Sequence, residues 1–127
     1  MIELSVSRLN KRFGGNHVLK DVSFEVKGAE MIGLIGPNGA GKTTLTNVLD
    51  GAIKPNSGTV YLNGKRIDQL PPFKVAKSGL GRTFQVTRSF RRMTVLENLY
   101  VPALALRKGH IGNELKEQAL EVLESLT

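Results

Sequence analysis

Apolar and polar residues alternate in two stretches near the start of the chain, Leu4–Leu9 and Val18–Val26. Alternation with a period of two predicts β-strands that bury one face. The run Met31–Ile35 is almost continuously apolar, which is typical of a strand buried on both faces of a sheet. The spacing that follows predicts a helix over Lys42–Leu49, with Gly51 as a left-handed cap.

The middle of the chain predicts a hairpin, a short helix and a further strand. Thr59–Leu62 and Lys65–Ile67 flank Asn63-Gly64, a dipeptide that favours the tight turns of β-hairpins. A proline pair precedes the short helix predicted over Phe73–Lys77. Leu80–Gln85 then predicts another strand.

Two helices are predicted in the last third of the chain. Thr94 and Glu97 form a capping box, and the helix that they open is expected to reach about Tyr100, where Pro102 disturbs it. A loop is expected at 108–112, and Asn113 is expected to cap the last helix. The apolar residues of that helix form one stripe, namely Leu115, Ala119, Val122, Leu123 and Leu126. Strands and helices together predict an α/β fold.

Eight residues between the apolar run and the first helix fit the pattern Gly-x-x-x-x-Gly-Lys-Ser/Thr, the phosphate-binding loop. They are Gly36, Pro37, Asn38, Gly39, Ala40, Gly41, Lys42 and Thr43. Glycines let the backbone curl so that its N–H groups form a nest for anions, and the helix adds its positive dipole end. Lys42 is expected to reach terminal phosphates, the Thr43 hydroxyl to bind Mg²⁺, and Thr44 to add a contact. The predicted ligand is a nucleoside triphosphate with Mg²⁺.

Composition narrows the class of protein. The net charge is +7, from 18 basic and 11 acidic residues, and cysteine is absent, which excludes a disulfide framework. The sequence contains no apolar run of membrane-spanning length and no signal pattern at its start, so a cytoplasmic protein is expected. Nucleic-acid binding is not expected, because no aromatic platform lies beside the tightest basic group. That group is Arg82, Arg88, Arg91 and Arg92.

Four segments, in this order, resemble a known family. They are Phe13-Gly14-Gly15 with Val18–Phe24; the loop Gly36–Thr44; Asn56–Val60 with Leu62-Asn63-Gly64; and Gly81–Gln85 followed by Met93–Leu99. The chain resembles the ATP-binding subunits of ABC transporters. Its Arg-Thr-Phe-Gln is most similar to the branched-chain amino-acid (Liv-type) importers, with the urea-type importers close to them. The resemblance implies a P-loop NTPase fold of ABC type, with an N-terminal antiparallel β part and the start of a helical subdomain.

The resemblance also implies roles for single residues, with ATP and Mg²⁺ as cofactors. Phe13 would stack on adenine, although a turn-flanking aromatic is the alternative. Val18 would pack beside the base or ribose, or equally belong to the core. Gln85 would contact Mg²⁺ or water and sense the membrane partner, or be a solvated glutamine at a strand end. The segment Val86–Met93 would face the transmembrane subunit, the alternative being a solvated basic surface.

The sequence lacks three elements of the family: an apolar strand that ends in Asp-Glu, the Leu-Ser-Gly-Gly-Gln signature and a switch histidine. His17 and His110 are interpreted as solvated. Because the family places these elements downstream, the chain is interpreted as an N-terminal piece, with a nucleotide-binding core at 1–85, the Q-loop and start of the helical subdomain at 86–127, and the C-terminal half absent. Met31–Ile35 would then lack a neighbouring strand, which predicts exposed apolar surface, marginal stability and aggregation.

For the parent protein the resemblance implies ATP hydrolysis that powers uptake of branched-chain or similar amino acids. A dimer of ATPase subunits would work beneath two permease subunits, on the inner face of the plasma membrane. Lys42 and Gln85 are the candidate catalytic residues, yet the chain by itself is expected to bind Mg-ATP weakly or not at all and to be inactive. The alternatives are the ATPase of another ABC system (a urea or amide importer, or a non-transport ABC protein) and a nucleotide-binding module without hydrolysis.

Overall fold

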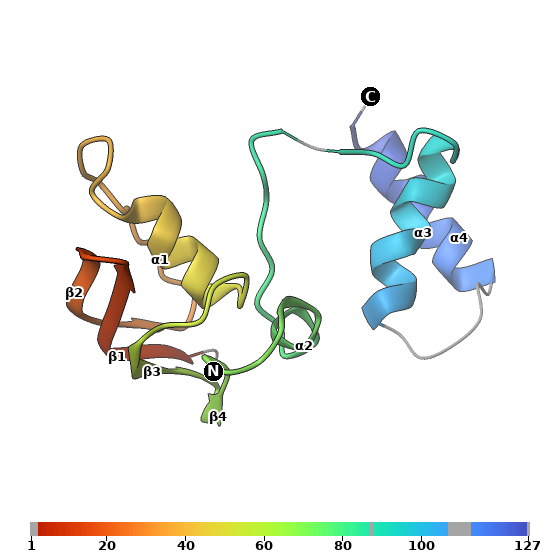
Figure 1. The fold of residues 1–127 in the computed structure, drawn as a ribbon. Helices are drawn as coiled ribbons and strands as arrows, with labels where there is room; N and C mark the ends of the chain where they lie inside the picture. The colour runs from red at the N-terminus through yellow and green to blue at the C-terminus, as the bar shows by residue number, and fades with distance from the viewer. Residues whose placement is uncertain (1–2, 87, 107–112, 127) are drawn as a thin grey trace. The chain divides into compact units, whose positions relative to one another are not determined.

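The computed structural model describes residues 3–86, 88–106 and 113–126. These residues form two compact units, with the boundary between Arg82 and Thr83. The first unit contains a sheet and two helices, and the second contains a pair of helices (Figure 1). The loop predicted at 108–112, with His110, lies outside the described residues.

The sheet of the first unit is antiparallel throughout. Its strands are β1 (Glu3–Phe13), β2 (Asn16–Lys27), β3 (Ser57–Leu62) and β4 (Lys65–Arg66), in the order β2-β1-β3-β4. The first two predicted strands and the predicted hairpin are therefore confirmed. Asn63 and Gly64 have φ values of 50° and 75°, the left-handed pair that a two-residue turn of type I′ needs.

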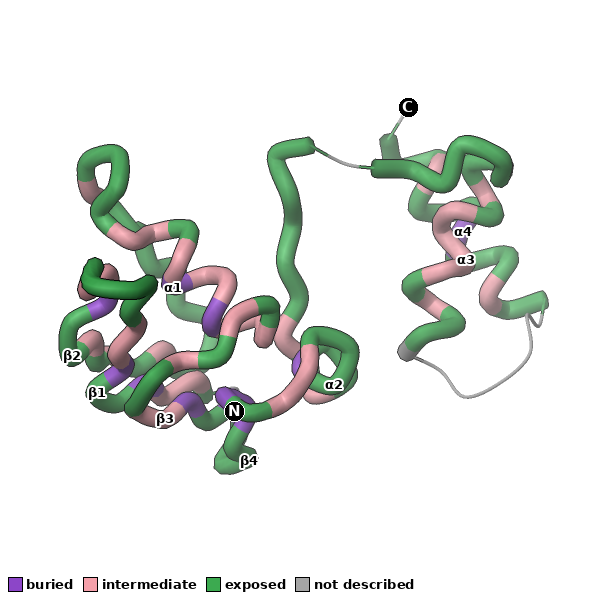
Figure 2. Tube along the Cα trace, viewed as in Figure 1, coloured by how far each residue is buried: buried purple, intermediate pink, exposed green. Residues whose placement is uncertain are grey.

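Helix α1 (Lys42–Leu49) forms over the predicted residues and lies across one face of the sheet (Figure 1). Gly51 follows it with φ of 80° and donates its N–H to the carbonyl of Val48 at 3.2 Å, as a left-handed cap does. The short helix α2 (Pro72–Lys77) confirms the predicted helix within one residue. Buried residues of the sheet and α1 make the core with the residues after β4 and in α2 (Figure 2): Val6, Leu9, Leu19, Leu45, Val48, Val60, Leu62, Ile67 and Val75.

A buried carboxylate closes the β3–β4 hairpin. Asp68 is 1% exposed and accepts hydrogen bonds from the backbone N–H of Val60 and from the side chains of Arg66 and Gln69, each at 3.0 Å. Burial alone would raise the pKa of Asp68, but the hydrogen bonds from Arg66, Val60 and Gln69 outweigh it and hold the pKa below its ordinary value. The folded state therefore stabilises the charged carboxylate of Asp68.

Met31–Ile35 is not a strand, which corrects the sequence prediction. Met31 is 100% exposed and Ile35 is 95% exposed, and Ile32 and Leu34 are about half exposed. The apolar run indicates a strand with neighbours on both sides, whereas none of the described strands pairs with it. The expected exposure of apolar surface at this segment is confirmed.

Leu80–Gln85 also forms no strand, so a second prediction is wrong. The sequence predicts a strand here, but Phe84 is 60% exposed. None of the described strands forms a ladder with these residues. The start of the segment is held instead by the Arg82 side chain, which donates to Asn47 and Asp50.

The second unit packs α3 (Val95–Leu106) against α4 (Asn113–Glu124). The capping box is confirmed: the Glu97 carboxylate accepts the Thr94 N–H at 2.7 Å, and the Thr94 hydroxyl accepts the Glu97 N–H at 3.2 Å. Helix α3 continues past Pro102 to Leu106, beyond the predicted end at Tyr100.

Packing between the two helices explains that longer α3 and tests the predicted stripe on α4. Leu99 and Ala103 of α3 line a small apolar cavity together with Leu115 and Ala119 of α4. This contact supports the helix on both sides of the proline. Ala119 of the stripe is buried, whereas Leu126 is 77% exposed, so the stripe buries only its inner part.

Candidate functional site: a phosphate loop and the pocket beside it

The loop between the apolar run and α1 is closed by its own lysine. Lys42 Nζ donates to the carbonyl oxygens of Gly36 at 2.5 Å and Pro37 at 2.8 Å. The N–H of Ala40 donates to the same Pro37 carbonyl at 3.2 Å. The backbone therefore curls, and the ammonium group spans the mouth of the curl. An ammonium held there faces any anion that the loop takes in.

The glycines of the loop occupy positions that other residues would strain. Gly39 and Gly41 have φ values of 82° and 91°. A Cβ on Gly41 would lie 3.2 Å from the carbonyl oxygen and from Cγ1 of Val18. Glycine at 41 is thus required by both the backbone conformation and the close approach of β2. That approach also brings Val18 to the loop.

The first turn of α1 is arranged to receive a negative charge. Gly41 is its N-cap, with no side chain to bond the first N–H groups, and no acidic residue occupies the first turn. The N–H groups of an uncapped first turn have no partner within the helix, and the helix dipole adds partial positive charge. Lys42, Thr43 and Thr44 start the helix at this end. The loop and the helix thus present N–H groups and an ammonium to one place.

A pocket of about 330 Å³ adjoins the loop. The loop residues that line it are Asn38, Gly39, Ala40, Gly41, Lys42, Thr43 and Thr44. Phe13 and Val18 line it as well, although they precede the loop by twenty residues or so in the sequence. The tight Gly14–Gly15 turn between β1 and β2 places both residues at that end of the sheet. A half-exposed aromatic ring thus lies beside an anion-binding loop, an arrangement suited to a nucleotide base with its phosphates.

Phe13 is also held by a cation. Lys11 Nζ lies 5.1 Å from the centre of the Phe13 ring and donates to the backbone carbonyl of Lys54 at 2.8 Å. The ring keeps 47% of its surface exposed. Sequence reasoning did not single out Lys11, and its position two residues before Phe13 on the same strand face is the signal that could have found it.

Gln85, another predicted site residue, is not part of the first unit. It belongs to the second unit, in the exposed stretch after Arg82 that forms neither helix nor strand. The structure thus brings together Phe13, Val18 and the loop within the first unit. Gly36 and Pro37 contribute as acceptors for Lys42.

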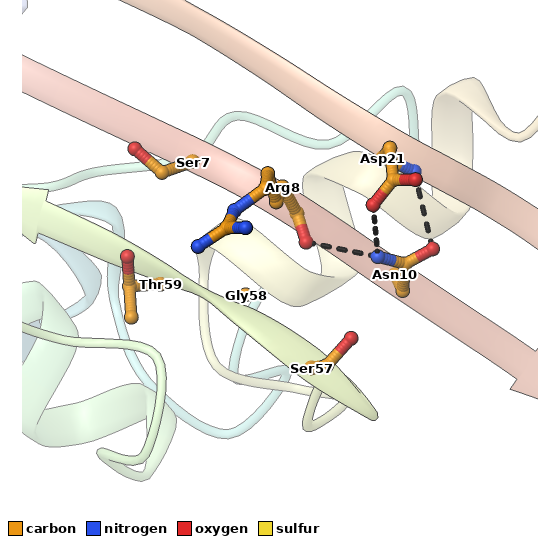
Figure 3. A pocket seen from close by; sticks show the side chains of 7 residues that line it. All are labelled: Ser7, Arg8, Asn10, Asp21, Ser57, Gly58 and Thr59. Carbon is orange, nitrogen blue, oxygen red and sulfur yellow. Dashed lines mark hydrogen bonds between the residues drawn. The ribbon is translucent and has the colours of Figure 1, made fainter.

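A second cavity, of about 380 Å³, lies on the sheet where β1 and β2 bulge (Figure 3). Arg8 and Asp21 have left-handed φ values of 45° and 47° there. The Asn10 amide donates to the Arg8 carbonyl at 2.9 Å and to the Asp21 carboxylate at 2.8 Å. A Cβ on Gly58 would lie 2.4 Å from the Arg8 carbonyl oxygen. The polar groups of Arg8, Asn10 and Asp21 are hydrogen-bonded to one another. They therefore stabilise the strained backbone of the bulge.

The same cluster corrects the interpretation of His17 as a solvated residue. His17 is only partly exposed, and its Nε2 lies 2.9 Å from the amide oxygen of Asn10. Because that oxygen accepts, Nε2 carries the proton of this bond. The sequence gives no sign of this partner, since a register shift between β1 and β2 creates the contact.

Comparison with known proteins places this geometry in a family. A family model described as ABC transporter matches residues 19–127. The branched-chain amino acid transport ATP-binding protein LivG of Salmonella typhimurium is 44% identical over 96% of this chain and 48% of its own length. The lipopolysaccharide export ATP-binding protein LptB of Haemophilus influenzae is 37% identical over 95% of this chain and 50% of its own. The chain spans about half the length of the curated relatives that it matches.

Solved structures of ATP-binding cassettes are similar to this chain in fold. The ADP conformation of MJ1267, an ATP-binding cassette of an ABC transporter, is 36% identical with a TM-score of 0.80, over 98% of this chain and 53% of its own. The dimeric ATP-binding cassette MJ0796 bound to ADP and Pi is 28% identical with a TM-score of 0.79, over 95% of this chain and 56% of its own.

Fold and loop together define a part of a P-loop nucleotide-binding domain. The chain belongs to the ABC transporter family, in the branch of its ATP-binding proteins. Proteins of this family bind and hydrolyse ATP. Within the described residues, no helix has both the length and the apolar character needed to cross a membrane.

Proposed function

We propose that this chain is the nucleotide-binding part of an ATP-binding subunit whose ATP hydrolysis powers uptake of branched-chain or similar amino acids. The observation that supports ATP binding is the closed loop, in which Lys42 spans the mouth beside an uncapped first turn of α1. The relatives named LivG support the amino-acid solute.

In this proposal each part of the pocket takes one part of Mg-ATP. The loop N–H groups and Lys42 would bind the phosphates, and the Thr43 hydroxyl would hold Mg²⁺, which would supply positive charge to the phosphates. Thr44 adds a polar contact. Phe13 stacks on adenine with Val18 at its edge. The Gln85 side chain would contact Mg²⁺ or water and would sense the membrane partner.

The proposed partners are permease subunits and a second ATPase subunit, with no nucleic acid. The dimeric MJ0796 cassette supports the second subunit. The described part of the segment 86–93 supports a docking surface, because Val86 is 77% exposed and Phe90 is 55% exposed between arginines. The protein would lie in the cytoplasm, on the inner face of the plasma membrane.

A second candidate function is supply of ATP energy to an exporter, which the similarity to LptB favours. The residues of the pocket serve both candidates equally, because both use the same ligand. The solute is chosen elsewhere in such assemblies. A cellular experiment therefore has to separate the two.

The test is complementation in a Salmonella strain that lacks LivG, with the full open reading frame that contains this chain, because the chain by itself is expected to be inactive. Restored uptake of labelled leucine, abolished by Lys42→Ala, is the expected result. A Lys116→Ala variant serves as control, because that exposed lysine lies on α4, away from the loop residues in sequence. Failure to restore uptake, with rescue of a strain lacking LptB, would favour the exporter instead.

A further inference from the structure

We propose that Arg82 is a positioning residue that ties the start of the segment carrying Gln85 to the far end of the helix that the phosphate loop opens. The inference rests on the proposed function, since it concerns how nucleotide in the loop affects Gln85. Its structural part, a contact between Arg82 and α1, is independent of that function.

The contact joins one guanidinium nitrogen to Asn47 in the last turn of α1 and to Asp50, the C-cap of that helix. Arg82 Nη1 donates to Asn47 Oδ1 at 2.6 Å and to Asp50 Oδ2 at 2.5 Å. Asn47 and Asp50 are three residues apart, so they share one face of the helix. The side chains of Arg82 and Asp50 are 26% and 19% exposed, which shields the ion pair from solvent more than a surface pair is shielded.

The position on the helix gives the contact its significance. Asp50 is the C-cap of α1, where partial negative charge gathers, so a cation there interacts favourably with the helix dipole. The N-terminal end of the same helix carries Lys42 and Thr43. Eight residues rise by about 12 Å, and a helix of this length moves as one piece. A shift of the loop on binding phosphates therefore shifts the partners of Arg82.

The chain itself links Arg82 to Gln85. Two residues, Thr83 and Phe84, separate the two, so their Cα atoms lie within about 11 Å of each other. The described residues from Leu80 to Val86 form neither helix nor strand, so backbone ladders do not fix this stretch. Leu80 and Arg82 line a small cavity with Leu49 and Asp50, which adds packing to the polar tie.

A purely structural ion pair is the alternative, and it predicts a different set of measurements. Such a pair would alter unfolding alone, whereas a positioning residue also alters how Gln85 responds to nucleotide. The chain has three glutamines, Gln69, Gln85 and Gln118, so labelling glutamine with ¹⁵N gives three side-chain amide signals. A Gln85→Glu variant assigns the relevant one.

The first arm of the test measures the tie without nucleotide. Urea unfolding of Arg82→Ala, Asp50→Ala and the double variant forms a double-mutant cycle. We expect each single variant to lower the midpoint and the double variant to lower it no further than the larger single effect. Additive effects would overturn the tie. Arg88→Ala, an exposed arginine six residues later, is the matched control and should leave the midpoint unchanged.

The second arm adds Mg-ATP at millimolar concentration, because the chain by itself is expected to bind it weakly at best. In the unchanged chain we expect the Gln85 amide signal to shift, and in Arg82→Ala we expect that shift to fall at least fivefold while the affinity for Mg-ATP stays within threefold. Arg82→Lys should restore part of the shift. An undiminished shift in Arg82→Ala would overturn the inference alone. No shift in the unchanged chain despite bound nucleotide would overturn the inference and the proposed role of Gln85, while nucleotide binding by the loop would stand. Failure of the unchanged chain to bind Mg-ATP would overturn it together with the proposed function.

Discussion

The phosphate loop and the apolar segment just before it are neighbours in sequence and opposites in structure. The hydrogen bonds that hold the loop come from the loop itself, because Lys42 donates to the carbonyls of Gly36 and Pro37. Helix α1 begins at Lys42. The segment Met31–Ile35 has the composition of a central strand, and it stays outside every described ladder with its side chains exposed. Local chemistry is enough to build a loop, whereas a strand needs a neighbour.

The largest effect contrasts a glycine in the paired strand β3 with a glycine in the unpaired apolar segment. Gly58→Ala should destabilise the chain by roughly 3 kcal/mol or more, because φ is 92° and the new Cβ would lie 2.4 Å from the Arg8 carbonyl oxygen. Gly33→Ala, in the apolar segment, should change stability by no more than about 0.5 kcal/mol, since nothing lies within 4 Å of its Cβ. Urea unfolding measures both. Equal effects would mean that the apolar segment is packed.

A smaller effect is expected at the buried carboxylate of the β3–β4 hairpin. Asp68→Asn should destabilise the first unit by about 1–3 kcal/mol at pH 7, because Arg66 would then donate to a neutral amide in place of a carboxylate. The folded pKa of Asp68 is lowered, so its contribution is complete above the unfolded pKa of about 3.9 and is lost as pH falls through the folded value.

Unfolding midpoints between pH 7 and pH 2 check the sign. The unchanged chain should lose more stability across the acid range than Asp68→Asn does. Parallel curves would show that the carboxylate has an ordinary pKa.

The smallest change in stability is expected at the exposed apolar segment itself. Met31→Ser with Ile35→Ser should leave the free energy of unfolding within about 0.5 kcal/mol, because both side chains are almost fully exposed. Self-association should fall, since exposed apolar surface drives it. Sedimentation velocity measures this, and Val48→Ser, in the core, is the contrasting variant that should unfold the chain. Unchanged self-association in the double variant would mean that another surface drives it.

Sequence reasoning succeeded where the signal is local. The bounds of α1, the Asn63-Gly64 turn, the capping box at Thr94 and the closed loop all depend on residues within a few positions of one another. The two wrong strands share one cause: the residues of a segment indicate whether it suits a strand, and they do not report whether a partner strand is there to pair. The meeting of Phe13 and Val18 with the loop came from the family resemblance, and the structure places all three at one pocket.

Three features had no sequence signal. The Asn10–Asp21 cluster depends on a register shift, and the continuation of α3 past Pro102 depends on packing against α4. The bond from Arg82 to Asp50 joins residues 32 positions apart. Each is a tertiary contact, and tertiary contacts override local propensity without leaving a pattern in one sequence.

The account depends most on phosphate binding by the backbone between Ile35 and Thr44. Amide ¹H–¹⁵N spectra of the chain, titrated with millimolar Mg-ATP, test this directly. The predicted result is a set of shifts concentrated in residues 36–44 and on Phe13, lost in Lys42→Ala and kept in Lys116→Ala. Shifts scattered over the sheet or gathered around Arg8, or an unchanged response in Lys42→Ala, would contradict it.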